Sequence, residues 1–399
     1  MSMNMMQAST QWGSRPDEER FWTMQELLDA TRTVRRNSAE KVSMPGLLEM
    51  GTTDDGKLAV INLDTGNHAI PTPHARKQLA RLCNMGGAAD VFDQMPVELA
   101  AQNYQWGLAN RADKEHRTKL LLCGVDDNIV LRAFTGEGYA RIWHDDIVEQ
   151  CLNLTQNHGW RVPPARPSNC ASTKIRKATA QDVIDYGSKS GFSGLTIKEG
   201  DDIGPAGLYY GPQPPELFVF MVLVDSTKTL EAPGGRALNR FVLLSNSEVG
   251  DRSFTVTGGY FDVVCGNHII WGAADVWEIK LRHVGQAVER ASEAMEVKLF
   301  EYQERNLDED AERIEKARKL VFGEDKETVV DAVFKKLRLA SRNVIEASYD
   351  RAEMVGVYGP PNTAWALASG MQEIAQEQSS VYKRQEIDEA AGRVLAASF

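Results

Sequence analysis

The chain has 399 residues and a formal net charge of −11, with 42% hydrophobic and 25% charged residues. This length and composition are typical of a globular protein with two domains, or with one core and a helical extension. The acidic charge excludes a protein whose whole surface binds nucleic acid, although it leaves room for a local basic groove.

Residues 1–20 are predicted to form an arm, and they have neither the basic nor the apolar segment of a secretory signal. No stretch approaches the roughly 20 apolar residues of a membrane span. The five cysteines lack CxxC spacing, which favours free thiols in a reducing compartment; they are Cys83, Cys123, Cys151, Cys170 and Cys265. We therefore expect a cytoplasmic protein with no membrane association.

Residues 21–160 are predicted to form an N-terminal α+β region. Apolar residues at helical spacing predict a helix over 21–36. Residues 119–123 and 128–134 are predicted strands, joined over two aspartates as a hairpin. A helix is expected to begin at His144, because the two aspartates that follow it stabilise the first turn.

Residues 161–205 are predicted to form a basic linker or loop, because prolines interrupt the segment and no acid separates its cations from Arg161 to Lys177. Residues 206–283 are predicted to form an antiparallel β core. Its apolar run Leu217–Val224 predicts a strand covered on both faces. Further strands are expected at about 238–245, 252–258, 260–265, 267–272 and 277–283.

Residues 284–399 have helical patterning and are predicted to form a long C-terminal helical region. The predicted fold class is therefore α+β, with a mainly antiparallel sheet core between an N-terminal helical and hairpin region and the C-terminal helices.

Two polar corners interrupt the predicted β core, Asn246-Ser247-Glu248-Val249-Gly250 and Cys265-Gly266-Asn267-His268. Asn and Ser bond nearby backbone groups, and glycine accepts positive φ, so a structural role explains both corners. His283 ends the apolar face of strand 276–283 and is expected to be a core histidine. We assign structural corner roles to Asn246, Ser247, Gly250, Cys265, Asn267 and His283.

No sequence motif indicates a metal or a cofactor. The seven histidines show neither HxxxH nor HExxH spacing, and Gly136-Glu137-Gly138 lacks the context of a phosphate loop. We expect no catalytic residue, no metal and no cofactor.

Residues 132–143 interleave arginines with aromatic residues, as in single-strand grooves where rings stack on bases and cations contact phosphates. In the alternative interpretation, Phe134 and Trp143 anchor the core and the arginines form a polar rim. The predicted nucleic-acid-binding residues are Arg132, Tyr139, Arg141, Lys174, Arg176, Lys177, Arg240, Arg252, Lys280 and Arg282.

The stretch LLSNSEVGDRSFTVTGGYFDVVCGNHIIWGA, continued by IKLRH, resembles the phage/plasmid-like protein family known as domain of unknown function 932. The resemblance includes LRAFTGEGYARIWHDDIVEQCL, ARLCNMGG with MPVELAAQNYQWGLA, and NTAWALASGMQEIA, and so spans roughly residues 75–380. It implies an occurrence in phages and plasmids but assigns no catalytic residue. A sheet rich in hairpins followed by a long helix is also similar to the core of phage single-strand annealing proteins, an analogy of fold alone.

Three hypotheses follow. The first is a phage- or plasmid-type cytoplasmic protein of DNA metabolism that binds single-stranded nucleic acid as a homo-oligomer. The second is a structural or assembly protein that forms a homo-oligomer through its C-terminal helices without nucleic acid. The third is an enzyme whose residues Asn246, Glu248, Asn267 and His283 converge in space; we favour a binding protein over an enzyme.

Overall fold

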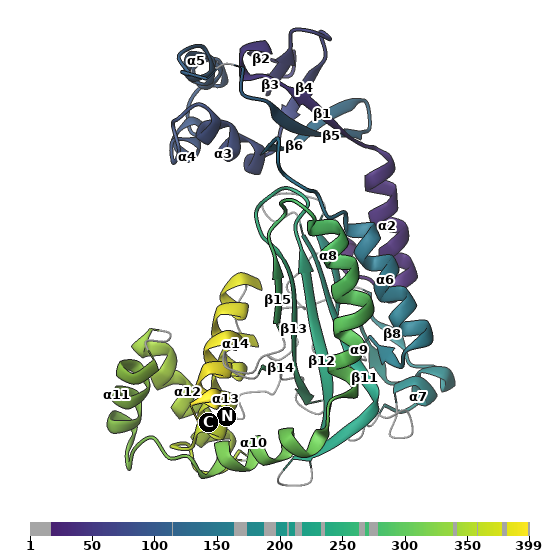
Figure 1. Cartoon of the computed structure of the whole chain (residues 1–399), viewed down its shortest axis with the longest axis vertical. Helices are drawn as coiled ribbons and strands as arrows, with labels where there is room; N and C mark the ends of the chain where they lie inside the picture. Colours follow the sequence, from purple (N-terminus) through teal and green to yellow (C-terminus); the bar gives the residue numbers. More distant parts are fainter. Residues whose placement is uncertain are drawn as a thin grey trace.

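The computed structural model describes residues 17–113, 115–162, 174–186, 197–205, 207–211, 218–232, 236–262, 268–270, 278–337, 341–356, 358–376 and 381–397. Figure 1 shows an N-terminal unit at one end, a large sheet with helices on both sides, and a helical C-terminal region. This architecture confirms the predicted α+β class and the long C-terminal helical region.

The N-terminal unit contains a six-stranded sheet with the order β1-β5-β6-β4-β3-β2. Strands β4 and β6 pair in parallel, and the other neighbours are antiparallel. Three helices cover the sheet, and Leu79 and Tyr104 lie in the core between the two layers. The strands are β1 (Ser38–Ser43), β2 (Leu48–Thr52), β3 (Leu58–Asn62), β4 (His68–Pro71), β5 (Thr118–Val125) and β6 (Asn128–Gly136). The three covering helices are α3 (Pro73–Leu82), α4 (Ala89–Phe92) and α5 (Val97–Ala109), and a short 3-10 helix, η3 (Pro45–Leu47), precedes β2.

The main sheet is antiparallel and has the path β10-β11-β12-β13-β14, to which β15 adds on β13 and β7 on β11. Residues 219–224 of β11 are buried on both faces wherever their side chains are described, as the continuous apolar run predicts. The strands are β7 (Trp160–Arg161), β10 (Leu208–Gly211), β11 (Phe218–Ala232), β12 (Arg236–Asn246), β13 (Phe254–Asp262), β14 (His268–Ile270) and β15 (Glu278–Leu281).

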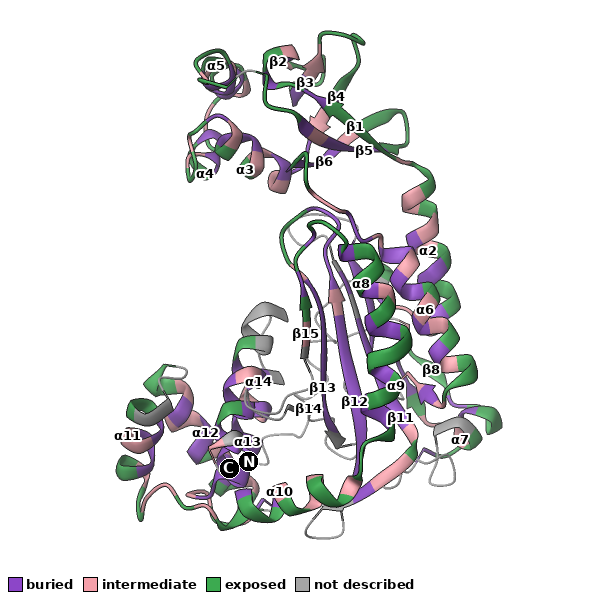
Figure 2. Cartoon of the chain, viewed as in Figure 1, coloured by how far each residue is buried: buried purple, intermediate pink, exposed green. Residues whose placement is uncertain are grey.

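Helices cover one face of the main sheet (Figure 1). They are α2 (Met24–Arg36), preceded by η2 (Asp17–Glu19), then α6 (His144–Asn157) and one continuous helix 287–304. The last consists of α8 (Ala287–Glu293), a π-helical turn η4 (Ala294–Lys298) and α9 (Leu299–Glu304). Their apolar side chains share a core with β11, β12 and β13, and Figure 2 shows these strands buried beneath helices whose outer faces are exposed.

The C-terminal helices form a second core that includes Leu230 and Leu238 of the main sheet. They are α10 (Leu307–Lys319), α11 (Lys326–Leu337), α12 (Arg342–Val355), α13 (Ala364–Gln376) and α14 (Val381–Ala396). None of the helices in the part of the chain that the structure describes has the length and apolar character to cross a membrane.

Three details differ from the sequence predictions. Helices α2 and α6 pack on the main sheet instead of the N-terminal unit, because their apolar faces share its core. The predicted linker 161–205 contains a small two-stranded antiparallel sheet, β8 (Arg176–Lys177) with β9 (Asp202–Ile203), and helix α7 (Ala180–Tyr186) between these strands in the chain. Two strands predicted between 252 and 265 are one strand, β13, because Gly258 and Gly259 continue its pairing with β12.

Candidate functional site

The corner between β12 and β13, residues 246–250, contacts the N-terminal unit. The backbone carbonyl of Val249 accepts hydrogen bonds from His74 Nε2 at 3.1 Å and Gln78 Nε2 at 2.7 Å, both on α3. Gly250 has φ +78°, a conformation that glycine adopts without strain, as the sequence predicts. The corner therefore joins the main sheet to the N-terminal unit.

Glu248 is the charged centre of this corner. Its carboxylate accepts hydrogen bonds from the backbone N–H of His144 at 2.8 Å and from Arg132 Nη1 at 3.1 Å. Arg141 Nη1 also donates to the backbone carbonyl of Glu248. Burial by itself raises the pKa of Glu248, but the charges of Arg132 and Arg141 and the hydrogen bond from the His144 backbone outweigh it and lower that pKa below its ordinary value. Glu248 is therefore an anion inside the protein.

Arg141 extends the cluster to strand β1. Its guanidinium contacts the Glu40 carboxylate, with Nε–Oε2 at 3.0 Å and Nη2–Oε2 at 2.8 Å. Lys119 Nζ lies 3.2 Å from the other oxygen of Glu40 and donates to the carbonyl of Tyr139 at 2.8 Å. The guanidinium carbon of Arg141 also lies 5.1 Å from the centre of the Tyr139 ring, within cation–π range.

His283 and Tyr139 stack with ring centres 5.0 Å apart and planes 2° from parallel. The hydroxyl of Tyr139 donates to the carbonyl of Ser247 at 3.3 Å, and the backbone N–H of Ile142 donates to His283 Nδ1 at 3.5 Å. Burial, with the charge of Arg141, lowers the pKa of His283 to about 4. His283 is therefore the neutral core histidine that strand alternation predicts.

Asn246 completes the corner. Its Nδ2 donates to the carbonyl of Ile142 at 2.8 Å and lies 3.1 Å from His144 Nδ1. Burial lowers the pKa of His144 to about 4, against the opposing influence of Glu248. A neutral His144 accepts the hydrogen bond from Asn246 at Nδ1.

The geometry bears directly on the hypothesis of an enzyme at this corner. Asn246, Glu248 and His283 do converge, while Asn267 and Cys265 lie outside the described residues. However, the three side chains are only 2 to 4% exposed, and neither of the two cavities described below is lined by them. A substrate needs access, so the arrangement is that of a buried polar joint.

Three of the predicted nucleic-acid-binding cations are placed where a phosphate cannot reach them. Arg132, Arg141 and Arg240 are between 1 and 6% exposed. Arg132 pairs with Glu248 and Arg141 with Glu40, as described above. Arg240 lies 3.1 Å from Asp310 and donates to backbone carbonyls at the end of α9. The prediction for these three residues is corrected: they are internal ion-pair partners.

Tyr139 is half-buried between His283 and Arg141, so neither ring face is placed to stack on a base. This assignment is corrected in the same way. Its phenolic pKa is raised, chiefly by burial, which keeps the hydroxyl a hydrogen-bond donor.

The cations near the small β8–β9 sheet interact with neighbouring groups. Arg176 forms a bidentate pair with Asp182 at 2.6 and 2.7 Å, and Lys177 lies 2.7 Å from Asp202. Lys174 Nζ donates to the carbonyl of Arg20 at 2.7 Å. Figure 1 shows β8 beside α7 and below α6, whereas β15 pairs with β13 on the other side of the main sheet.

The three remaining predicted cations gather at one corner of the main sheet. Lys280 on β15 pairs in register with Thr255 of β13, Arg282 follows two residues later, and Arg252 comes just before β13. All three are exposed. We call Arg252, Lys280 and Arg282 the β15 edge.

A groove of about 430 Å³ lies along the β15 edge and is shared with helix α14. Arg252 and Lys280 line it together with three hydroxyl side chains, those of Ser245, Ser253 and Thr255. Glu386 and Glu389 of α14 line it as well, as does Asp251. Sequence reasoning missed the two glutamates, although their spacing of three residues on a predicted helix would place them on one face.

The described ranges contain three of the five cysteines. Cys83, Cys123 and Cys151 are buried free thiols, and burial raises the pKa of Cys83 to about 12, which makes this thiol unreactive. Within the same ranges, no group of three or more His, Cys, Asp or Glu side chains is arranged to hold a metal ion.

The chain matches no curated protein and no solved structure. The match to a family model begins at β11 and does not include the upstream segments 80–109 and 131–152 that resemble the same family in sequence. Residues 217–397, from the start of β11 to the end of α14, match the family described as a domain of unknown function (DUF932).

Proposed function

We propose that this protein binds single-stranded nucleic acid at the β15 edge and that it is a phage- or plasmid-type protein of DNA metabolism, acting in the cytoplasm as a homo-oligomer. The observation that carries the proposal is the meeting of three exposed cations at one corner of the sheet, beside a groove lined with hydroxyl groups. Cations and hydroxyls are the side chains that contact phosphate oxygens.

The spacing of the edge suits a polynucleotide backbone. Lys280 and Arg282 are two residues apart, so in extended chain they lie about 6.7 Å apart on the same side. Arg252 lies just before β13, the strand that pairs with β15. The three charges thus form a short track that an extended single strand follows by electrostatic contact.

Helix α14 lowers the affinity of the β15 edge for nucleic acid. Glu386 and Glu389 face the same groove as Arg252 and Lys280, and like charge repels phosphate. The acids lower the affinity at the groove and direct the strand toward the outer side of β15. Neutralising them therefore strengthens binding, whereas neutralising the β15 edge weakens it.

The topology offers a supporting analogy. Strands β11, β12 and β13 form an antiparallel meander, and helix 287–304 crosses one face of it. This order is similar to the core of phage single-strand annealing proteins, and it supports the proposal only as a likeness of fold.

The test is oligonucleotide binding at low salt by four proteins. Replacing Arg252, Lys280 and Arg282 with Ala is expected to weaken binding about tenfold or more. A matched control replaces three exposed lysines elsewhere, Lys298, Lys319 and Lys335, and keeps wild-type affinity. Replacing Glu386 and Glu389 with Gln is expected to tighten binding about threefold. The proposal is overturned if the wild-type protein binds no oligonucleotide. It is also overturned if the variant of the β15 edge and the variant of the three control lysines lose affinity equally.

The second candidate is an assembly protein that forms a homo-oligomer through its C-terminal helices. Phe334 on α11 and Met354 on α12 are 42% and 59% exposed on helices that pack against each other, and buried apolar side chains drive most association. Sizing the purified protein before and after nuclease treatment separates the candidates. An oligomer that persists without nucleic acid, in a protein that binds no oligonucleotide, favours assembly.

A further inference from the structure

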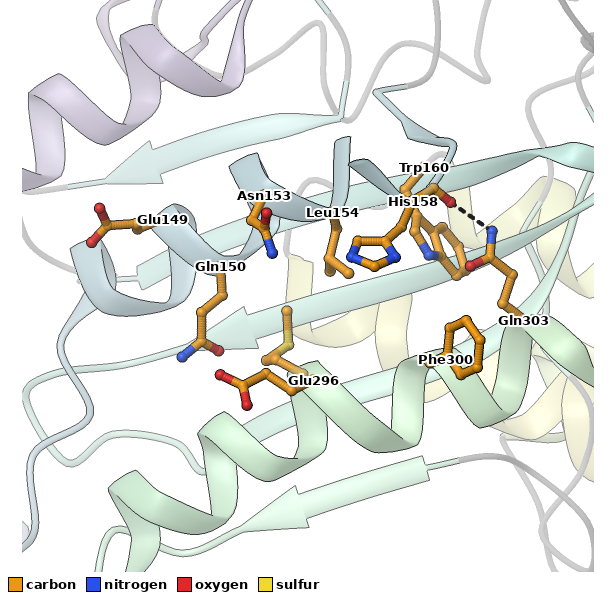
Figure 3. Close-up of a pocket in the computed structure, with 10 residues that line it drawn as sticks. Glu149, Gln150, Asn153, Leu154, His158, Trp160, Glu296, Phe300 and Gln303 are labelled. Atoms are coloured by element: carbon orange, nitrogen blue, oxygen red, sulfur yellow. Dashed lines mark hydrogen bonds between the residues drawn. The ribbon is translucent and has the colours of Figure 1, made fainter. Parts of the chain in front are cut away.

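A cavity of about 240 Å³ lies between α6 and the continuous helix 287–304, over the main sheet (Figure 3). It is separate from both the buried corner and the β15 edge, since they share none of its lining residues. Its volume is below the range typical of drug-sized ligands, so it suits a smaller molecule.

The floor of the cavity is apolar. Trp160, Met295 and Leu154 are buried in the core beneath it. Phe300 stands at the rim with 53% of its surface exposed, although aromatic side chains of this size normally gain by burial. The middle of the cavity therefore favours an apolar or aromatic part of a ligand.

Two polar atoms in the wall lack partners within the described part of the chain. The indole Nε1 of Trp160, which is fully buried, donates to no acceptor, and Gln150 Oε1 accepts from no donor. Buried polar groups are normally hydrogen-bonded, and an indole N–H can only donate. A ligand that satisfies both presents an acceptor to Trp160 and a donor to Gln150.

The end of the cavity at Gln150 is acidic. Gln150 Nε2 donates to Ser292 Oγ at 2.9 Å, and Ser292 Oγ donates to Glu296 Oε1 at 3.5 Å. Glu149, also in the wall, is paired with Arg32 at 2.6 Å, whereas Glu296 forms no ion pair among the described residues. A cationic group of the ligand is therefore the best hydrogen-bond donor to this end of the cavity.

Trp160 lies at the opposite end, next to His158 and Gln303, which are joined by a hydrogen bond from Gln303 Nε2 to the carbonyl of His158 at 2.8 Å. Figure 3 shows Gln150 and Glu296 at one end of the cavity and Trp160, His158 and Gln303 at the other. The two kinds of polar group are thus separated by the apolar middle.

The helix on one side is irregular at the cavity. Residues 294–298 form a π-helical turn, which includes Met295 and Glu296 of the wall. Such turns are rare, cost stability and occur frequently at functional sites. The π-helical turn is an observation independent of the unpartnered polar atoms, and it also indicates a functional site at this cavity.

We propose that this cavity binds a small amine whose protonated nitrogen contacts Glu296 and Gln150, whose apolar or aromatic body lies against Phe300 and Met295, and whose far end accepts a hydrogen bond from Trp160. Tyramine is a suitable probe, because it carries an ammonium group, a ring and a phenolic oxygen. Its counterpart 4-hydroxyphenylacetate keeps the ring and the phenol but replaces the cation with an anion.

The test is titration of the full chain with both probes by calorimetry or ligand-observed NMR. Tyramine is expected to bind saturably, and 4-hydroxyphenylacetate at least about tenfold more weakly. Glu296→Gln is expected to weaken tyramine about tenfold, with Phe300→Ala weakening it severalfold. The control Glu301→Gln makes the same charge change on the same helix outside the cavity, and it leaves the affinity unchanged.

Absence of saturable tyramine binding up to about 5 mM overturns the inference. Equal binding of both probes, or equal effects of Glu296→Gln and Glu301→Gln, overturns it as well. The result is independent of the proposed nucleic-acid function, because none of these substitutions touches the β15 edge.

Discussion

Glu248 Oε2 accepts a hydrogen bond from Arg132 Nη1 at 3.1 Å, and each side chain is only 4% exposed. The two residues are 116 positions apart in the chain, one at the corner after β12 and the other on β6. The pair therefore holds the N-terminal unit against the main sheet inside the protein.

Removing one member of the pair leaves the other charged and buried. Glu248→Gln is expected to lower the free energy of unfolding by about 3–5 kcal/mol, because Arg132 loses its counter-charge. Urea unfolding measures the change, and Arg132→Met in the same chain is expected to restore part of it.

A matched control is Glu137→Gln, at an exposed carboxylate that pairs with Arg117 on the surface. We expect it to change stability by less than about 1 kcal/mol. Similar losses for Glu248→Gln and Glu137→Gln would contradict the role given to the buried pair.

His144 and His283 make stability depend on pH. Their pKa values are lowered to about 4 in the folded protein, whereas the unfolded chain has the ordinary value of 6.5. As pH falls below 6.5 the unfolded state binds protons that the folded state does not, so stability decreases. Between pH 7 and pH 5 the loss is about 2 kcal/mol for each histidine.

The check is urea unfolding of the wild type and of His283→Gln at both pH values. The variant is expected to lose about 2 kcal/mol less than the wild type over this interval. His68→Gln, which replaces an exposed histidine on β4, is the control for the loss of a histidine elsewhere. A wild-type stability that does not vary with pH would refute the buried neutral histidines.

Gly250 is expected to resist substitution. An added β-carbon there is strained by φ +78° and lies 3.4 Å from Thr135 and 3.5 Å from Tyr139. Gly250→Ala should cost more than about 1 kcal/mol by thermal or urea unfolding. Gly138→Ala, where the β-carbon meets no atom within 4 Å, should be close to neutral; equal costs at both positions would count against the strain at the corner.

Local patterns in the sequence predicted the elements well. The hairpin of β5 and β6 followed from apolar strands on both sides of two aspartates, and Asp126 does take positive φ in the turn. The buried position of His283 followed from alternation along its strand. These features depend on neighbours within a few residues, which the sequence displays directly.

The partners of the arginines could not be predicted in the same way. Arg141 meets Glu40 across 101 positions, and Arg240 meets Asp310 across 70. Alternation places a side chain on a face but does not say which acid from a distant element covers it. Nine cations and one tyrosine were therefore similar candidates from the sequence, and the structure brings three of the exposed cations together at the β15 edge.

The most direct measurement is the salt dependence of single-strand binding, with a labelled oligonucleotide of about 30 nucleotides followed by fluorescence anisotropy. We predict that log Kd rises linearly with log salt concentration for the wild type. Replacement of Arg252, Lys280 and Arg282 with Ala is expected to reduce the slope by about 2, as the loss of three phosphate contacts requires. An unchanged slope in this variant, or no measurable binding by the wild type at low salt, would contradict nucleic-acid binding at the β15 edge.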